Sequence, residues 1–186
     1  MKTVWQSIRM LAVLSVLTGL VYPLAMTGIA QALFWREANG SLVVVNDAAI
    51  GSELVGQPFT SVRYFWPRPS ALGYNPLLSA GTNLGPASKV LRDSVAARAA
   101  RLGAPVATVP SDLLLASGSG LDPHISPEAA EFQVARVLSA RGMPVSRRNE
   151  LQTLIQTHTE LPQFGIFGEP RVNVLLLNLA LDSLMQ

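Results

Sequence analysis

Few side chains in this sequence have the type and spacing that catalysis needs. There is no cysteine, and there are only two histidines, His124 and His158. Asp122-Pro123-His124 places a carboxylate beside an imidazole, which suggests acid–base or metal chemistry. However, the sequence indicates no partner for a general base, and neither histidine has metal-ligand spacing around it. We therefore predict no catalytic residue and no metal site. Asp122 is expected to cap a turn, His124 to bond to nearby backbone, and His158 to lie partly buried at a helix end.

A glycine-rich segment offers a different chemistry, the binding of an anion. It runs Ser79-Ala80-Gly81-Thr82-Asn83-Leu84-Gly85, shortly before a predicted helix. Glycine-rich turns expose backbone N–H groups, and a helix N-terminus favours negative charge. The Gly-Lys-Ser/Thr ending of a Walker loop is missing, so the pattern favours a structural loop over an anion cradle.

Two stiff segments carry charges that suit contact with another group. Arg68 stands between Pro67 and Pro69, so its guanidinium is positioned for a bidentate contact with a carboxylate, either within the chain or on a partner. Glu169 and Arg171 flank a proline in Gly168-Glu169-Pro170-Arg171, which predicts a turn with an internal ion pair.

The apolar N-terminal segment must position everything that follows it. Residues 10–35 contain no charged side chain. As a helix they would extend about 39 Å, enough to cross a hydrocarbon core of roughly 30 Å. Trp5 and Trp35 bracket the run as interfacial anchors, and Lys2 and Arg9 precede it. The positive-inside rule then predicts a cytoplasmic N-terminus (1–9), a transmembrane helix (10–35) and an extracytoplasmic domain (36–186).

A cleaved signal peptide is the alternative interpretation of the same segment. The start is basic, an apolar stretch follows, and Ala30-Gln31-Ala32 resembles a small-residue cleavage site. Cleavage near Ala32 would release an exported soluble binding protein or enzyme. The length of the apolar run favours the permanent anchor.

Charge and element patterns define the class of the remaining domain. Lys2 and Arg9 account for the whole net charge of +2, so residues 36–186 are formally neutral, which argues against nucleic-acid binding. Short strands are predicted at 41–45, 53–55 and 62–66. Helices are predicted at 91–102, after Ser126 and after Ser146. The apolar tail 172–184 favours a buried or docking helix, although 171–174 also alternates like a strand. The class is α+β.

Several segments together resemble one protein family. They are Tyr64 to Ser70, Gly81 to Pro86, Ser117 to Pro127, Gln133 with Arg136-Val137, and Gly168 to Leu175 with Leu177-Asn178. In this order, behind one N-terminal span, they resemble the C subunit of the Kdp potassium-transporting ATPase (KdpC). The glycine loop departs from the family at Ala80 and at Ala87-Ser88, where Gly and Thr-Asn are expected.

The resemblance implies an accessory subunit of the bacterial inner membrane that is not an enzyme. Its partners would be a potassium-translocating subunit, an ATP-hydrolysing P-type subunit and a small single-span subunit. It would stabilise this high-affinity potassium importer and act as a catalytic chaperone that raises the ATP affinity of the hydrolysing subunit. ATP and potassium would belong to the complex, with no cofactor of the chain's own.

The resemblance also supplies candidate site residues. The likeness of the glycine loop to nucleotide-contacting loops implies contacts from Ser79, Gly81, Thr82, Asn83 and Gly85. An extracytoplasmic domain would lie across the membrane from the ATP, however, so we favour docking near the potassium entrance and an indirect effect on ATP. The candidates for partner docking, or for a structural motif, are Arg68, Asp122, His124, Glu169, Arg171 and Asn173.

Overall fold

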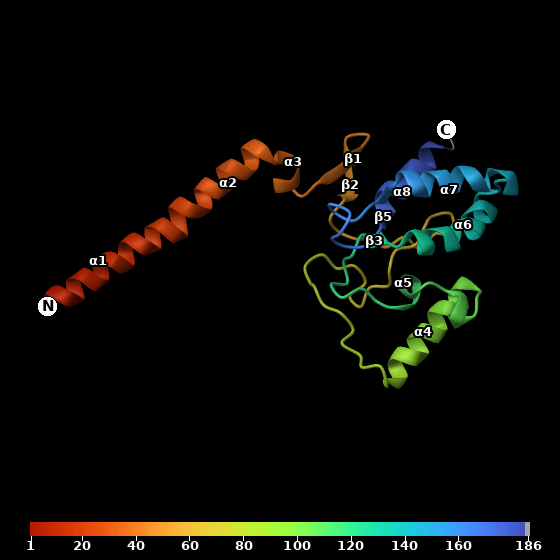
Figure 1. The fold of residues 1–186 in the computed structure, drawn as a ribbon, viewed down its shortest axis with the longest axis horizontal. Coiled ribbons are helices and arrows are strands. Elements are labelled where there is room, and N and C mark those ends of the chain that lie inside the picture. Colours follow the sequence, from red (N-terminus) through yellow and green to blue (C-terminus); the bar gives the residue numbers. More distant parts are fainter. Residues whose placement is uncertain (185–186) are drawn as a thin grey trace. The chain divides into compact units, whose positions relative to one another are not determined.

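The computed structural model describes residues 1–184, and the chain divides into two compact units (Figure 1). The first is Met1–Leu42, and the second, which we call the C-terminal domain, is Val43–Gln186. Each unit is described by itself below.

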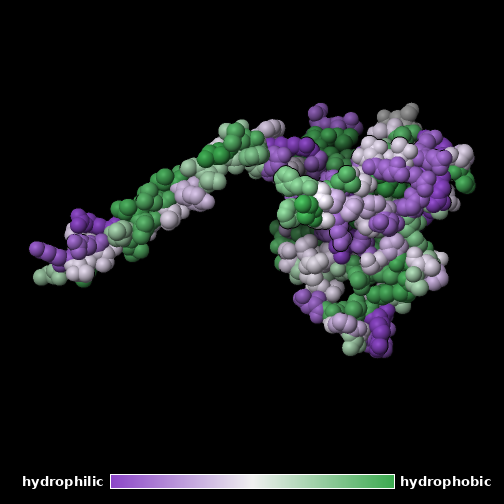
Figure 2. All heavy atoms as spheres, in the orientation of Figure 1, coloured by the Kyte–Doolittle hydropathy of each residue, from purple (hydrophilic) through white to green (hydrophobic). Residues whose placement is uncertain are grey.

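The first unit is dominated by one long apolar helix. Helix α1 (Lys2–Val16) continues through a π-helical turn, η1 (Leu17–Val21), into α2 (Tyr22–Leu33), and the short helix α3 (Trp35–Ala38) follows. No side chain of α1, η1 or α2 is buried, and Figure 2 shows hydrophobic residues along most of this helix. Its length and composition make it the one candidate membrane span among the described residues. Apolar side chains left uncovered on every face require lipid or partner helices around them.

The π-helical turn explains how the span accommodates a proline. Pro23 has no N–H, so it leaves a carbonyl in the preceding turn without its helical donor. The wider turn η1 lies immediately before Pro23, as is usual for a local bulge in a membrane helix.

The C-terminal domain combines two small sheets with several helices. A hairpin is followed by a long irregular stretch, and a three-stranded antiparallel sheet has order β3-β5-β4. The strands are β1 (Leu42–Val45), β2 (Ala48–Ser52), β3 (His124–Ile125), β4 (Thr159–Glu160) and β5 (Arg171–Asn173). The α-helices are α4 (Lys89–Leu102), α5 (Ser111–Leu114), α6 (Pro127–Arg141), α7 (Arg148–Thr157) and α8 (Val174–Ser183), and the 3-10 turns are η2 (Val106–Thr108) and η3 (Val145–Arg147). This mixture confirms the predicted α+β class.

Helix α6 occupies the middle of the hydrophobic core. It contacts α7, which also contacts α8, and α5 packs on another part of α6 (Figure 1). Val134 and Val137 of α6 are fully buried, together with Leu151 of α7 and Leu177 of α8. Local signals fix the ends of α6: Ser126 Oγ accepts from Ala129 N at 3.1 Å, and Gly142 ends the helix with φ 65°.

Two buried carboxamides hold residues 65–66 within the irregular stretch. Asn178 Oδ1 accepts from Phe65 N at 2.8 Å, and its Nδ2 donates to Phe65 O at 3.0 Å. Gln133 repeats the pattern on the next residue: its Oε1 accepts from Trp66 N at 2.8 Å and its Nε2 donates to Trp66 O at 3.1 Å. Each side chain therefore satisfies both the backbone N–H and the backbone C=O of one residue, as a neighbouring strand would.

This arrangement overturns the predicted strand at 62–66. The segment has no strand assignment because its backbone partners are side chains of α6 and α8. The predicted strand at 53–55 is also wrong: Glu53 and Leu54 form a turn, Val55 makes only an isolated bridge with Ser52, and the strand lies earlier at Ala48–Ser52. The predicted strand at 41–45 is confirmed over Leu42–Val45. Ser41 lies outside it, with φ 45°.

The sequence did not locate the first residues of α7 and α8, which the structure shows. Ser146 was expected to cap the third helix, but it lies within η3, and α7 begins at Arg148 without a side-chain cap. The apolar tail contains both predicted elements in succession. Arg171–Asn173 is the central strand β5, and Asn173 Oδ1 then caps α8 by accepting from Leu175 N at 3.1 Å.

The carboxamide contacts give the first prediction, for Asn178→Ala. Loss of the amide leaves the N–H and C=O of the fully buried Phe65 without partners, so the free energy of unfolding should fall by about 2–4 kcal/mol. Urea unfolding of the full chain in detergent measures the change. Asn149→Ala, at an exposed position of α7, is the control and should change stability by less than about 0.5 kcal/mol. Equal stability of the two variants would contradict the structural role of Asn178.

Candidate functional site

The glycine loop is a pinned surface segment without regular structure. Ser79, Thr82, Asn83 and Gly85 are exposed, and Gly81 is half-buried. Ala80 N donates to Ser119 O at 3.1 Å, which ties the loop to residues 117–120. A Cβ on Gly81 would meet Gly118 O at 3.1 Å, so glycine is needed there for close backbone approach.

The helix that follows the glycine loop starts a few residues later than a phosphate cradle requires. Helix α4 begins at Lys89, and Ser88 is its N-cap, accepting from Leu91 N at 3.4 Å. Residues 86–88 therefore separate the loop from the helix N-terminus. These contacts give Gly81 a packing role, and nucleotide contact by this loop stays a prediction.

The structure gathers most of the other predicted residues around one cavity of about 330 Å³. Its charged lining comes from the irregular stretch, from α5, from the loop around β3 and from the start of β5. These residues are Arg68, Asp112, Asp122, His124, Glu169 and Arg171. The sequence could not place them together, because they lie up to about a hundred positions apart along the chain. We call this group the mixed-charge pocket.

Asp122 organises the mixed-charge pocket. Its Oδ2 accepts from Arg68 Nη1 at 3.0 Å, and its Oδ1 accepts from the backbone N–H of His124 at 3.0 Å, so the predicted turn cap is confirmed. The contact from Arg68 is intramolecular and uses one nitrogen, where a bidentate contact was considered. The imidazole Nδ1 of His124 stands 3.6 Å from Oδ1, too far for a strong hydrogen bond.

These contacts control the ionisation of Asp122. Burial by itself raises the pKa of this carboxyl group, but His124 and then Arg68 stabilise the charged form and outweigh burial. The pKa of Asp122 therefore lies below its ordinary value of 3.8, and the group is a fixed anion at neutral pH. A general base needs a pKa near the working pH, which Asp122 does not have. Its permanent charge, held in place by Arg68, is suited to binding a polar group.

Two predictions about neighbouring residues are corrected or reassigned. The internal ion pair of 168–171 is wrong, because Arg171 Nη2 pairs with Glu160 Oε2 of β4 at 2.9 Å, across the sheet. Register explains this: Arg171 lies directly opposite Glu160. Asn173 is buried and lies outside the mixed-charge pocket, where it caps α8 and donates to Glu53 O at 2.8 Å. His158 ends α7 with Nδ1 2.9 Å from Leu154 O, as predicted.

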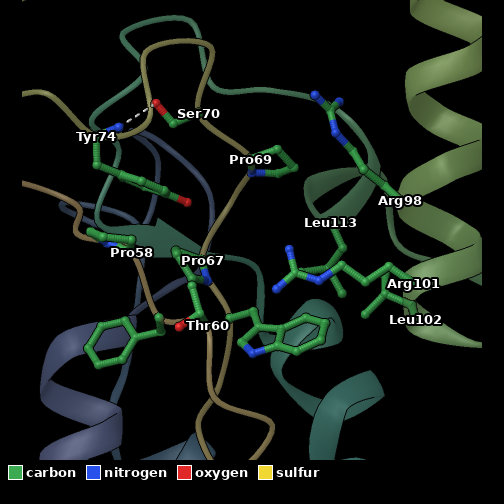
Figure 3. Close-up of a pocket in the computed structure, with 12 residues that line it drawn as sticks. Pro58, Thr60, Pro67, Pro69, Ser70, Tyr74, Arg98, Arg101, Leu102 and Leu113 are labelled. Carbon is green, nitrogen blue, oxygen red and sulfur yellow. Dashed lines mark hydrogen bonds between the residues drawn. The ribbon is translucent and has the colours of Figure 1, made fainter.

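A second pocket was not predicted from the sequence. It has a volume of about 280 Å³ and lies between α4 and the segment of Pro67 and Pro69 (Figure 3). Two guanidinium groups lie over the ring of Trp66: Arg101 at 4.2 Å and Arg136 at 4.0 Å from its centroid. The one available signal was the spacing of Arg98 and Arg101, three residues apart on a helix. We call it the Trp66 pocket.

The loop between β4 and β5 exposes a group of large apolar side chains. Leu161 is 76% exposed, Phe164 91%, Ile166 77% and Phe167 65%. The loop is nevertheless well hydrogen-bonded, since Gln163 N donates to Phe167 O at 2.9 Å and Phe167 N donates back to Gln163 O at 3.0 Å. An ordered, exposed apolar tip of this kind marks a contact surface.

No group of three or more potential metal ligands occurs among residues 1–184. The span and the two pockets together define a class of protein: a membrane-anchored α+β subunit whose polar sites are arranged for contact with other groups. A family model described as "KdpC: K+-transporting ATPase, c chain" matches residues 4–183. The chain therefore belongs to the KdpC family.

Curated relatives agree along the whole chain. The "Potassium-transporting ATPase KdpC subunit" of Geobacter sulfurreducens is 50% identical and covers 100% of both chains, and that of Geobacter metallireducens is 50% identical over 99% of both. The protein of the same name from Polynucleobacter asymbioticus is 48% identical over 98% of this chain and 100% of its own. Family membership makes the chain an accessory subunit of a P-type potassium-transporting ATPase that is not itself catalytic.

The lowered pKa of Asp122 gives the second prediction, for Arg68→Gln. The pKa of Asp122 is lower in the folded chain than in the unfolded chain, so its ionised form stabilises the fold. This stabilisation is fully present above the unfolded pKa and is lost as the pH falls through the folded pKa. Arg68→Gln should therefore cost about 1–2 kcal/mol near pH 7, and the difference from the parent chain should shrink as pH falls below about 4.

Melting temperatures across this pH range measure the effect. Lys89→Gln removes an exposed i,i+4 pair, with 80% and 62% of the two side chains exposed, and serves as the control. That variant should match the parent chain closely at every pH. A deficit in Arg68→Gln that is as large in acid as at neutral pH would contradict the role assigned to Asp122.

Proposed function

We propose that this chain anchors and stabilises an ATP-driven, high-affinity potassium importer, and that it raises the ATP affinity of the hydrolysing subunit as a catalytic chaperone. Its partners are the potassium-translocating subunit, the ATP-hydrolysing subunit and the small single-span subunit. The family match over residues 4–183 carries the proposal, because it includes both the apolar helix and the C-terminal domain.

The proposed topology follows from charge at the two ends of the span. Residues 1–9 lie in the cytoplasm, 10–35 cross the inner membrane, and 36–186 form the periplasmic domain. Lys2 and Arg9 precede the uncharged run, while Arg36 is followed at once by Glu37. The match of the family model from residue 4 onward argues against loss of this segment by cleavage near Ala32.

The effect on ATP is indirect in this arrangement. A periplasmic domain cannot reach a nucleotide that is bound on the cytoplasmic side. Binding of the chain to one conformation of its partners would shift their equilibrium towards the state that binds ATP tightly. Such a mechanism needs no nucleotide contact from Ser79, Gly81, Thr82, Asn83 or Gly85.

The loop of residues 161–167 is the best candidate for the docking surface. A protein groove fits this loop better than anionic lipid does. No Lys or Arg occurs between residues 161 and 170, and Glu160 and Glu169 flank the apolar tip. Loops that insert into anionic membranes usually carry flanking basic residues. Glu169 also lines the mixed-charge pocket, so the apolar tip and the charged groups of Arg68, Asp122, His124 and Arg171 offer neighbouring contacts to one partner.

Topology can be tested with single cysteines because the chain contains none. Ser7→Cys lies before the uncharged run and Ser183→Cys lies exposed near the end of α8. In spheroplasts, a membrane-impermeant maleimide should label Ser183→Cys at once, whereas Ser7→Cys should react only after lysis. Intact mass of the labelled chain should show that residues 1–32 are retained. The opposite labelling pattern, or a chain trimmed near Ala32, would contradict the proposed topology.

Docking can be tested with Phe164→Ser combined with Phe167→Ser. Both side chains are exposed, so folding should be preserved while an apolar anchor is lost. Upon co-expression with the other subunits, co-purification should fall at least about tenfold, and the residual complex should show a higher KM for ATP. Val145→Ser, at a position 78% exposed elsewhere on the domain, is the control. Full co-purification of the double variant would rule out this loop as the docking surface.

A further inference from the structure

Positive charge around the Trp66 pocket has no counter-charge in the described structure. Five of the ten arginines of the C-terminal domain pair with a described carboxylate. These are Arg68, Arg141, Arg147, Arg148 and Arg171. Arg98, Arg101 and Arg136 make no ion pair with any described residue, yet all three lie at or beside this pocket.

Neutral groups surround these three guanidinium groups. Arg98 Nη1 donates to Leu114 O at 2.6 Å, and Arg136 Nη1 donates to Val62 O at 2.6 Å and to Tyr64 O at 3.1 Å. Burial, together with repulsion from Arg101, lowers the pKa of Arg136 to about 10. Burial likewise lowers the pKa of Arg98. Burying these cations close to one another costs free energy. Such groups with perturbed pKa values occur mainly at functional sites.

The lining of the pocket indicates what kind of ligand would use this charge. Pro67, Pro69 and Leu113 form apolar walls, and no Asp or Glu lines the pocket. Arg98 and Arg101 extend from α4 towards this proline segment (Figure 3). The volume of about 280 Å³ is at the small end for ligand pockets, so the fitting group is a compact anion on a short apolar body.

Tyr74 and Ser70 shape the remaining side of the pocket. Ser70 Oγ accepts from Tyr74 N at 3.0 Å, and Tyr74 Oη donates to Arg68 O, so the phenol is fixed and neutral. Burial raises the pKa of Tyr74 to about 12, although Arg101 and Arg98 oppose that shift. The phenol therefore adds no negative charge to the pocket. The positive charges of Arg101 and Arg98 lie close enough to affect its pKa.

We propose that the Trp66 pocket binds a phosphate group carried on a small apolar body, with Arg98 and Arg101 as the ligating side chains and Arg136 as the cation behind Trp66. A tetrahedral phosphate group presents its oxygens in several directions, so both arginines that line the pocket can contact it, whereas a carboxylate holds its two oxygens in one plane. The guanidinium fork matches phosphate oxygens, and a stacked arginine keeps its N–H groups free for such contacts. The phosphate could be supplied by the head group of an anionic phospholipid or by a free phosphate ester.

The test uses the full chain in nanodiscs of zwitterionic lipid. Glycerol 3-phosphate and dihexanoylphosphatidylglycerol are titrated at constant ionic strength, with dihexanoylphosphatidylcholine and acetate as comparison probes. Melting temperature reports binding, together with tryptophan fluorescence of a chain in which Trp5→Phe and Trp35→Phe leave Trp66 as the single tryptophan. Both phosphate probes should stabilise the parent chain, and Arg98→Gln with Arg101→Gln should weaken their binding at least about tenfold.

Matched variants keep the result interpretable. Arg92→Gln removes an exposed arginine of the same helix that does not line the pocket, and should bind as the parent chain does. Arg101→Lys keeps the charge but loses the fork and should show an intermediate loss. The melting temperature of each variant without probe shows whether it folds.

The two sources of phosphate give different supporting results. Tighter binding of dihexanoylphosphatidylglycerol than of glycerol 3-phosphate identifies a lipid head group, and equal binding identifies a free ester. The proposal is overturned if neither phosphate probe binds, if acetate binds equally well, or if Arg92→Gln weakens binding as much as the pocket variants do. Acetate binding would indicate that a carboxylate, such as one from a partner subunit, fills the pocket.

Discussion

The C-terminal domain depends on two buried carboxamides that act as a strand. Asn178 of α8 bonds both the backbone N–H and the backbone C=O of Phe65, and Gln133 of α6 does the same for Trp66. Gln133 is 1% exposed and Asn178 is 2% exposed, so water cannot replace these two side chains as backbone partners. This pairing fixes an irregular segment between two helices and drives Phe65 into the core, where it is fully buried.

The same anchored segment connects the two pockets. Trp66 follows Phe65 and lies under Arg101 and Arg136, and Arg68 comes two residues later and reaches Asp122. The prolines at 67 and 69 keep these side chains at fixed spacing, because proline restricts its own φ and the conformation of the residue before it. A shift of this segment would therefore move both pockets at once, which is a physical route for coupling between them.

The two pockets handle charge in opposite ways. In the mixed-charge pocket, Asp122 is matched by Arg68, and only 28% of each side chain is exposed, so the pair both orients the neighbouring groups and stabilises the fold. In the Trp66 pocket, cations face one another and neutral carbonyls. The apolar loop at 161–167 adds a contact surface of a third kind. For a subunit whose family has no catalytic function, these surfaces are where specificity for partners and ligands can reside.

The sequence by itself determined the features that depend on local pattern. The apolar span, the helix from Ser126 to Gly142, the turn at Asp122 and the family resemblance all follow from residues close together in the chain, and the family match confirms the last. Only the tertiary structure decided what 62–66 pairs with, that Arg171 pairs with Glu160, and that Arg101 and Arg136 meet Trp66. The reason is physical: β-branched and aromatic residues fit any half-buried extended segment, so the sequence pattern cannot specify whether the backbone partner is a strand or an amide from a distant helix.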